Sequence, residues 1–279
     1  MTALKISLRG KEGGGGKEGD MGIPKPIRFN NKGLNEWNIL HCYRGSIAHG
    51  TYRPNNEPNS IDDKDTMAVC IPPLDRYFGL KEYGSRGTSE IKQDEWDIVI
   101  YELRKFIRLL KKGNPNVLSV LWIEKEYFIS KTDTGQMLID NKELFVSKDV
   151  YFSFIGYAKA QLHRMTHMRF EGYMGEKRKR LVEKYGYDTK NASHLMRLLR
   201  MGIEFLTTGE LQVLRKHDAT ELLEIKAGKW SMEQIQSEAK RLFALAEESF
   251  VRSDLPRKVD DNKINDFCVE LLKKHFKER

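Results

Sequence analysis

The sequence predicts an α+β protein, with a mixed sheet and its helices followed by an all-helical C-terminal region. Two observations predict this. Short apolar runs of β-forming residues alternate with helical patterns as far as about residue 145, and only helical patterns occur after it. We therefore expect a flexible glycine-rich tail over 1–22, a first domain with the sheet over 23–145, and a helical domain over 146–279 that closes a cleft.

Composition and charge narrow the class of protein. Hydrophobic residues make up 39% and charged residues 32% of the 279 residues, which is typical of a globular chain. The net charge of +8 favours polyanionic partners such as nucleotides or nucleic acid, although many basic enzymes bind no polymer. No stretch approaches the roughly 18 apolar residues of a membrane span or resembles a signal peptide, so we expect a cytoplasmic protein with no membrane contact.

Three strands are expected in the first domain, at Ile39–Tyr43, Asp65–Ile71 and Asp97–Ile100. Pro72 and Pro73 end the second of them, because proline cannot continue a central strand. The three cysteines are too far apart for a metal knot or a disulfide framework, so we expect all of them to be reduced and two of them to lie in strands. They are Cys42, Cys70 and Cys268.

Helices follow the third strand. The apolar residues at helical spacing are Leu103, Phe106, Ile107 and Leu110. Gly113 is placed to end this helix, and Asn114 with Pro115 is placed to begin the next. Beyond residue 145 the helical patterns are SKDVYFSFIGYAKAQLHRM, SHLMRLLRMGIEFL, SMEQIQSEAKRLFALAEESFV and INDFCVELLKKHFKER.

A glycine-serine pair, Gly45 and Ser46, comes directly after the first strand. Glycine lets the backbone approach an anion closely, and a helix starting there would offer free N–H groups to a triphosphate. Such a pair by itself is most often a plain turn. A phosphate-binding role for this pair therefore depends on which other functional residues lie near it.

Carboxylates follow about twenty residues later, in the segment SIDDKD. Asp63 and Asp65 are two residues apart, so on an extended strand both side chains point to one face, within reach of one divalent ion. Three aspartates in four residues would repel one another unless water or a cation neutralises them, and a solvated acidic loop is the plain alternative. Either Asp62 or Asp63 is the first ligand; we choose Asp63 because only it shares a strand face with Asp65.

A third carboxylate is expected from Asp97, at the start of the neighbouring strand. A charge at that strand end is suited to holding a second magnesium ion and polarising an attacking hydroxyl. Glu95 lies two residues earlier on the same face and is the alternative.

The helical region supplies cations. At about 100° per residue, Lys190, His194, Arg197 and Met201 share one helix face. The opposite face should pack in the core, and consists of Leu195, Leu199, Gly202 and Leu206. The plain interpretation of the cationic face is a solvated one. The histidine pair His163 and His167 lacks the glutamate of a zinc-protease helix and is interpreted as surface, whereas His49, beside the Gly-Ser turn, is a candidate phosphate contact.

Taken together, these segments resemble a known family. The stretches RGSIAHGT, SIDDKDTMAVCIPP, DIVIYELRKFIRLLKKGNPNVLSVLW and YGYDTKNASHLMRLLRMGIEFLTTGEL are similar to the phage-type and RNA-ligase-associated predicted nucleotidyltransferases of the DNA polymerase β superfamily. The resemblance runs from about residue 37 to about residue 232. It implies a polymerase-β-like fold, with the first domain as the nucleotidyltransferase domain.

The resemblance also implies roles for individual residues. Gly45 and Ser46 would hold nucleotide phosphates, and Asp63, Asp65 and Asp97 would be the catalytic metal ligands for Mg²⁺, with Mn²⁺ as an alternative. It favours a ligand-binding role for the cationic face, so that triphosphate or acceptor contacts are expected from Lys190, His194 and Arg197. The family often has Ser-Asp directly before the acid pair and a shorter loop, which this sequence lacks.

The expected activity is transfer of a nucleoside monophosphate from a nucleoside triphosphate, such as ATP, to a hydroxyl, with release of pyrophosphate. The acceptor is an RNA end, a protein or a small molecule. The alternative is a catalytically silent accessory protein that binds nucleotide or nucleic acid. Pyrophosphate release discriminates the two.

Overall fold

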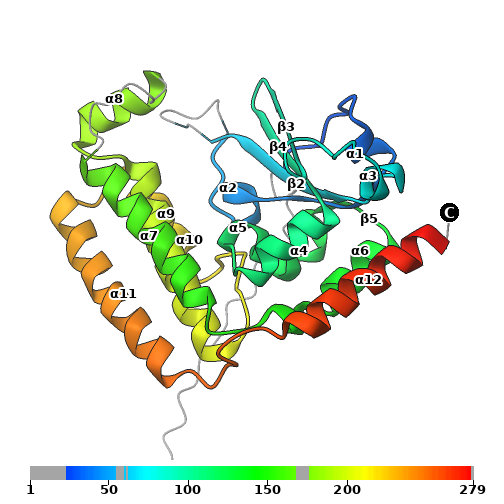
Figure 1. Ribbon diagram of the computed structural model, residues 1–279. Coiled ribbons are helices and arrows are strands. Elements are labelled where there is room, and N and C mark those ends of the chain that lie inside the picture. Colours follow the sequence, from blue (N-terminus) through cyan, green and yellow to red (C-terminus); the bar gives the residue numbers. More distant parts are fainter. Residues whose placement is uncertain (1–22, 55–59, 61, 168–175, 278–279) are drawn as a thin grey trace, which may run out of the picture.

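The computed structural model describes residues 23–54, 60, 62–167 and 176–277, and has the architecture that the sequence predicts (Figure 1). A five-stranded mixed sheet has the order β3-β4-β2-β1-β5. Its strands are β1 (Asn38–Tyr43), β2 (Lys64–Cys70), β3 (Thr88–Gln93), β4 (Trp96–Glu102) and β5 (Phe128–Lys131). The glycine-rich tail, 1–22, lies outside the described residues.

The central strands are the ones that the sequence predicts. β2 runs parallel to β4, while its other neighbour, β1, is antiparallel. Residues Thr66 to Cys70 of β2 are all buried, which explains why their apolar run is so clear in the sequence. Cys42 and Cys70 lie in β1 and β2 and are free thiols, as expected.

The two edge strands were not predicted. β3 has the sequence TSEIKQ with no fully buried residue, and β5 has only four residues, none of them buried. An edge strand faces solvent along one side and needs no apolar run, so its sequence carries little β signal. Both strands are recognisable only from their pairing, β3 with β4 and β5 with β1.

Short helices surround the sheet. They are α1 (Lys32–Asn35), α2 (Gly45–Ala48), α3 (Asp75–Phe78), α4 (Leu103–Lys111), α5 (Pro115–Leu118) and α6 (Asp133–Asp140), with 3-10 turns at Ser119–Trp122, Lys125–Tyr127 and Lys142–Phe145. The predicted helix ends are confirmed: Gly113 has φ of 62°, and the Asn114 side chain accepts hydrogen bonds from the first N–H groups of α5.

The C-terminal half is helical throughout its described residues, as predicted. Its helices are α7 (Val150–His167), α8 (Glu176–Tyr185), α9 (Thr189–Thr208), α10 (Ala219–Lys226), α11 (Met232–Arg252) and α12 (Asp261–Lys277). α9 is the centre of this layer and packs against α7, α10 and α11. α12 leaves the layer and returns to the sheet region, where it packs against α4 and α6 (Figure 1).

One buried apolar cluster joins the two halves. It includes strand residues such as Ile39 and Ile98 together with Leu195 and Leu199 of α9, on the helix face that was predicted to be buried. The helical layer therefore stands beside the sheet with continuous packing between them. None of the described helices is both long and apolar enough to cross a membrane.

Candidate active site

The Gly-Ser turn connects β1 to the short helix α2. Gly45 has φ of 61°, in the left-handed region that favours glycine. A Cβ atom at this position would lie 2.5 Å from Oδ2 of Asp65. Glycine is therefore required here for two reasons, its backbone conformation and the space that it leaves for a carboxylate.

Two of the three predicted acids lie side by side. Asp65 and Asp97 are paired in the parallel register of β2 and β4, so both leave the sheet at the same position along the strands. Nη2 of Arg44, the residue before the turn, lies 3.5 Å from Oδ1 of Asp65 and 3.7 Å from Oδ1 of Asp97. Glu95 instead pairs with Lys64 at 2.8 Å, which leaves Asp97 as the neighbour of Asp65.

The environment of Asp65 raises the cost of its negative charge. Burial raises the pKa of Asp65 to about 6, against the opposing effect of Arg44 and Lys190. Oδ1 of Asp97 is buried and has no hydrogen-bond partner. Asp63 differs from both: its side chain is 60% exposed, and its carboxylate lies 3.9 Å from Nζ of Lys190.

The donor set fits a hard divalent cation, since carboxylate oxygens are the ligands such ions prefer and Oδ1 of Asp97 accepts no hydrogen bond from the described residues, its nearest cation being Arg44 at 3.7 Å. Asp65 and Asp97 are the pair best placed to hold it. Within the described part of the chain, no three His, Cys, Asp or Glu side chains gather closely enough to form a metal site. Asp63 is therefore not drawn into a cluster with the other two.

The predicted cationic face of α9 is turned toward these acids. Lys190, His194 and Arg197 line one pocket together with Gly45 and Asp65. The face is not a solvated one, because only 8% of Arg197 is exposed. Its helix begins at Asp188, whose side chain accepts a hydrogen bond from the N–H of Asn191 and so fixes the first turn.

Arg197 is a buried cation without an anionic partner. Its Nη1 lies 3.2 Å from the sulfur of Met201, and it forms no ion pair with any described residue. Burial lowers the pKa of Arg197 to about 9, and the nearby Arg215 acts in the same direction. A positive charge held this way gains most from an anion brought in from outside.

A second buried charge pair was not foreseen from the sequence. Asp62 is 1% exposed, and its Oδ2 accepts hydrogen bonds from the N–H of Arg53, at 2.9 Å, and from Nζ of Lys226. Nζ of Lys190 lies 3.7 Å from the other oxygen. Lys226 lies in α10, 164 residues away, and also donates to the carbonyl of Thr51 at 2.9 Å. Asp62 is thus the counter-ion of pocket lysines.

The pocket holds about 110 Å³, a size suited to phosphate groups rather than to a whole nucleotide. It contains all five predicted nucleotide-binding residues, including Ser46, and one predicted acid, Asp65; Asp63 and Asp97 do not line it. The lining residues that sequence reasoning did not assign are Thr51, Asp62, Ser193 and Lys226; His49 was named only as a candidate phosphate contact. Thr51, Asp62 and Ser193 lie within the stretches that carry the family resemblance, where Asp62 was considered only as an alternative metal ligand, whereas Lys226 lies outside them and is identified only by the shared pocket.

Comparison with known protein families gives one match. Residues 32–270 match the family described as RlaP, the RNA repair pathway DNA polymerase beta family. The chain belongs to this family. The match spans the sheet and most of the helical layer, so it includes both sides of the pocket. It confirms the resemblance to the polymerase β superfamily.

The comparisons with solved structures and with curated proteins give no information beyond membership of the RNA repair pathway DNA polymerase beta family. A nucleotidyltransferase-like protein from Exiguobacterium sibiricum, solved at 1.90 Å, is 12% identical, with 88% of this chain and 76% of that chain covered. Its TM-score of 0.25 is too low to support a statement on fold or function. No curated protein matches the chain.

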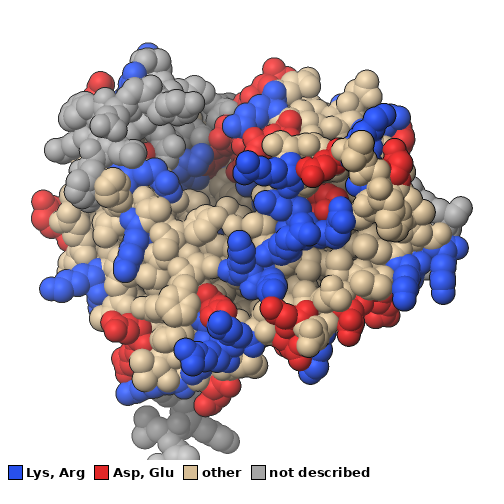
Figure 2. Space-filling view, viewed as in Figure 1, with Lys and Arg blue, Asp and Glu red and all other residues tan. Residues whose placement is uncertain are grey.

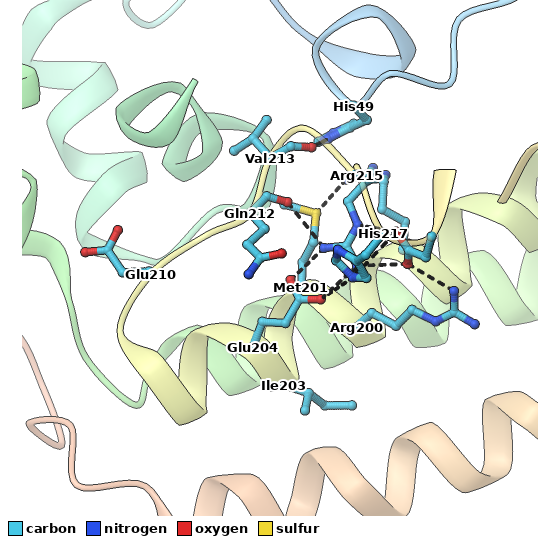
Figure 3. Close-up of polar contacts among 12 residues, drawn as sticks. His49, Arg200, Met201, Ile203, Glu204, Glu210, Gln212, Val213, Arg215 and His217 are labelled. Atoms are coloured by element: carbon cyan, nitrogen blue, oxygen red, sulfur yellow. Dashed lines mark hydrogen bonds and ion pairs between the residues drawn. The ribbon is translucent and has the colours of Figure 1, made fainter. Parts of the chain in front are cut away.

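In this member of the polymerase beta family, a buried network supports the pocket from behind (Figure 3). Nδ1 of His49 lies 2.8 Å from the carbonyl oxygen of Val213, and the N–H of Arg215 donates to the carbonyl of His49. The fully buried Arg215 guanidinium pairs with Glu204 at 2.6 Å and with Asp218 at 2.8 Å. The segment between α9 and α10 is thereby fastened to the turn that carries Gly45.

Proposed function

We propose that this protein is a Mg²⁺-dependent nucleotidyltransferase, with Mn²⁺ as an alternative ion. It transfers a nucleoside monophosphate from a nucleoside triphosphate to a hydroxyl acceptor and releases pyrophosphate. An RNA end is the acceptor that we favour, because the family is named for RNA repair and the chain carries a net charge of +8. A protein or small-molecule hydroxyl is the alternative acceptor.

One observation carries this proposal. A single pocket is lined by a Gly-Ser turn, a desolvated carboxylate and a buried, unpaired arginine, drawn from α2, β2 and α9. Acids beside a phosphate-sized cationic pocket are the combination that phosphoryl transfer needs, because its catalysis is mainly positioning and electrostatic stabilisation. A structural ion-pair network would instead have paired Arg197.

In the proposed mechanism, the two sides of the pocket have different tasks. Gly45 and Ser46 approach the phosphates with backbone and hydroxyl groups. Lys190, His194 and Arg197 neutralise the charge that develops on the pyrophosphate as it leaves. The acceptor oxygen forms a bond to the α-phosphorus, the bond from that phosphorus to the bridging oxygen breaks, and the acceptor's proton is released.

The carboxylates form the metal-binding side. Asp65 and Asp97, with Asp63 as the third candidate, would hold the divalent ion. When bound, such an ion supplies positive charge to the phosphates and lowers the pKa of the acceptor hydroxyl. Asp62 pairs with Lys226 and lies 3.7 Å from Nζ of Lys190, which stands between Asp62 and the candidate ligand Asp63.

The second candidate function is a binder without transferase activity, and one observation favours it. The Arg44 guanidinium lies between Asp65 and Asp97, where it already balances part of their charge. A protein that had replaced its metal ion by an arginine would look similar. Such a protein would bind a nucleoside triphosphate without releasing pyrophosphate.

One experiment separates the two. The purified chain is incubated with each nucleoside triphosphate, labelled in the α-phosphate, together with Mg²⁺ or Mn²⁺ and cellular RNA or protein. We expect pyrophosphate release and label in RNA, with a loss of about a hundredfold or more in Asp65→Asn. The exposed Asp266→Asn, on α12, is the matched control and should keep full activity.

Calorimetric titration with nucleoside triphosphate and Mg²⁺ completes the test. Binding without pyrophosphate release, across all triphosphates and acceptors, would support the silent binder. If Asp63→Ala, Asp65→Ala and Asp97→Ala kept full affinity for nucleoside triphosphate and full transfer activity, the three aspartates would not be part of the active site.

A further inference from the structure

A second groove lies away from the candidate active site, between α7 and α11. Both helices pack mainly against α9 and meet each other only weakly, so a channel of about 590 Å³ stays open between them. Figure 1 shows the two helices side by side at the edge of the helical layer. The groove is lined by Lys159, Leu162, His163, Gln236, Ala239, Lys240 and Phe243.

The charged side chains that line the groove are lysines, while the exposed Glu247 lies on the same face of α11 two turns beyond Lys240, near Tyr151. Lys159 stands on the α7 wall and Lys240 on the α11 wall; both are exposed, and neither forms an ion pair with a described residue. No carboxylate lines the groove. The lysine-rich surface of α12 differs, because Asp266 and Glu270 stand among its lysines. The α7/α11 groove is thus complementary to a polyanion and the α12 surface is not.

Aromatic side chains extend the groove along the line where α7 and α11 face each other, which we call the seam. Phe243 lines the groove, and Phe152, 61% exposed, shares one face of α7 with Lys159 and His163 at about 100° per residue. The Phe152 ring contacts Phe250 of α11, with ring centroids 5.4 Å apart. An exposed aromatic ring costs solvation unless a partner covers it.

The α7 surface between the aromatic end and the lysine end is open at one position. Gly156 lies on the same face of α7, between the aromatic end and the lysine end, and a Cβ atom there would meet nothing within 4 Å. From Phe152 to His163 the helix rises about 16 Å at 1.5 Å per residue, enough for a few nucleotides. In Figure 2 the surface over α7 and α11 is largely uncharged, with Lys and Arg side chains on it and Asp and Glu side chains at its margins.

We propose that the α7/α11 groove binds single-stranded RNA, as the docking site for the acceptor strand. Lys159 and Lys240 contact backbone phosphates from the two walls, and bases stack on Phe152 and Phe243. This combination of a basic groove with stacking platforms is how proteins hold single strands without reading sequence. The choice of RNA as acceptor rests on the proposed function; the groove's own features specify a flexible polyanion with planar groups. An apolar peptide would leave the lysines without partners, and a second copy of the chain, which itself carries a net charge of +8, is a poorer electrostatic match than a polyanion.

The test is RNA binding by fluorescence anisotropy, with labelled oligouridylate and oligoadenylate and without nucleotide or metal ion. Lys159→Glu combined with Lys240→Glu should weaken binding tenfold or more. It should also lower the slope of log Kd against log salt by about 1.4, because each lost phosphate contact on a single strand removes about 0.7. Phe152→Ala should weaken binding with an unchanged salt slope, because it removes stacking and not charge.

The matched control is Lys273→Glu combined with Lys277→Glu on α12. It changes the net charge equally, at exposed positions. The control should bind RNA with the salt slope of the unaltered chain. Equal losses in both double variants would mean that only total charge matters, and unaltered binding in the groove variant would place RNA elsewhere; either result overturns the proposal. A dimer that the groove variant dissociates would also overturn it, in favour of a second copy.

Failure of this inference is distinguishable from failure of the proposed function. Affinity for nucleoside triphosphate, measured by calorimetry without RNA, should be the same in the groove variant and the unaltered chain. If the unaltered chain binds RNA through the groove but releases no pyrophosphate, the groove stands and the transferase proposal falls. If transfer occurs and the groove variant transfers to RNA equally well at limiting RNA, the groove proposal falls alone.

Discussion

Two arginines in neighbouring parts of the helical layer are both buried, and their surroundings are opposite. Arg215, in the segment between α9 and α10, is fully buried and is held by Glu204 and Asp218. Arg197, in α9, contacts the sulfur of Met201 and forms no ion pair with any residue of the described part of the chain. Hydrogen bonds and carboxylates raise the pKa of Arg215 despite its burial, whereas burial lowers the pKa of Arg197 to about 9.

The difference separates structure from function. A buried charge that the fold satisfies stabilises an arrangement of segments, and breaking it leaves uncompensated partners. A buried charge that the fold leaves unsatisfied is costly to keep, and is explained when a ligand supplies the missing anion. Arg197 lines the phosphate-sized pocket and Arg215 does not, in agreement with this division. Four measurements test this division between the two arginines.

The largest expected loss of stability is at Arg215. Arg215→Ala removes the buried guanidinium that pairs with both Glu204 and Asp218 and leaves Asp218 with Arg200 as its remaining strong cationic partner among the described residues, so we expect the free energy of unfolding to fall by about 3–5 kcal/mol. Urea denaturation measures it. Arg241→Ala is the control: Arg241 pairs with Glu238 on the surface, and its loss should cost less than about 1 kcal/mol. If the free energy of unfolding fell by a similar small amount in both variants, Arg215 would not be a structural residue and would not differ from Arg197 in this respect.

The next largest effect is expected at Asp62. Asp62→Asn removes the counter-ion of Lys226 and should lower the free energy of unfolding by about 2–3 kcal/mol, because it leaves a buried ammonium without its charge partner. Asp63→Asn, one residue along and largely exposed, should change it by less than about 1 kcal/mol. The reverse order would mean that Asp63 and not Asp62 is the structural carboxylate.

The pH dependence of stability at His41 tests whether a buried base without an acidic partner is held neutral. Like Arg197, it is a base without an acidic partner; it contacts the Thr66 hydroxyl at 3.0 Å, and burial lowers its pKa to about 4 from 6.5. Between those values the unfolded chain binds a proton that the folded chain does not, so stability falls as pH falls from 6.5 toward 4.

The contribution of His41 to this loss should reach about 2 kcal/mol. His41→Gln should therefore lose less stability than the unaltered chain between pH 7 and pH 4.5, in urea titrations at each pH. The exposed His163→Gln serves as control and should follow the unaltered chain. Parallel curves for all three chains would show that His41 is not held neutral.

The smallest effect on stability is expected at Arg197, with a large effect on binding. Arg197→Met removes a charge that the fold leaves unpaired, so the free energy of unfolding should change by less than about 1 kcal/mol or rise. Affinity for nucleoside triphosphate should fall tenfold or more, by about 1.5–3 kcal/mol. Calorimetry and urea denaturation on one preparation measure both. A loss of stability as large as that of Arg215→Ala would make Arg197 a structural residue.

Much of the central fold follows from sequence patterns, because local rules act there. The apolar runs of β2 and β4 and the helical spacing of α9 identify elements whose faces are buried. Wheel geometry places Lys190, His194 and Arg197 on one face, which the shared pocket confirms. The polar edge strand β3 gives no comparable signal, because half of its backbone faces solvent.

The candidate site is predicted less completely than the fold. The Lys226–Asp62 pair joins residues 164 positions apart, and no local sequence pattern around either residue predicts the contact. Burial of Arg197 cannot be predicted from the sequence either, because a helical wheel shows which face a residue lies on and not how deeply that face is buried. The choice of Asp97 over Glu95 rested on strand position, and it agrees with the register that sets Asp97 beside Asp65. The ligand role of the three acids stays a prediction.

The return of α12 to α4 and α6 has a mechanical consequence. The chain leaves the sheet region before α7 and comes back to it after α11, so α12 adds a second attachment of the helical layer to the sheet region. An outward swing of the layer would have to break the contacts of α12 in addition to the apolar packing between the two halves.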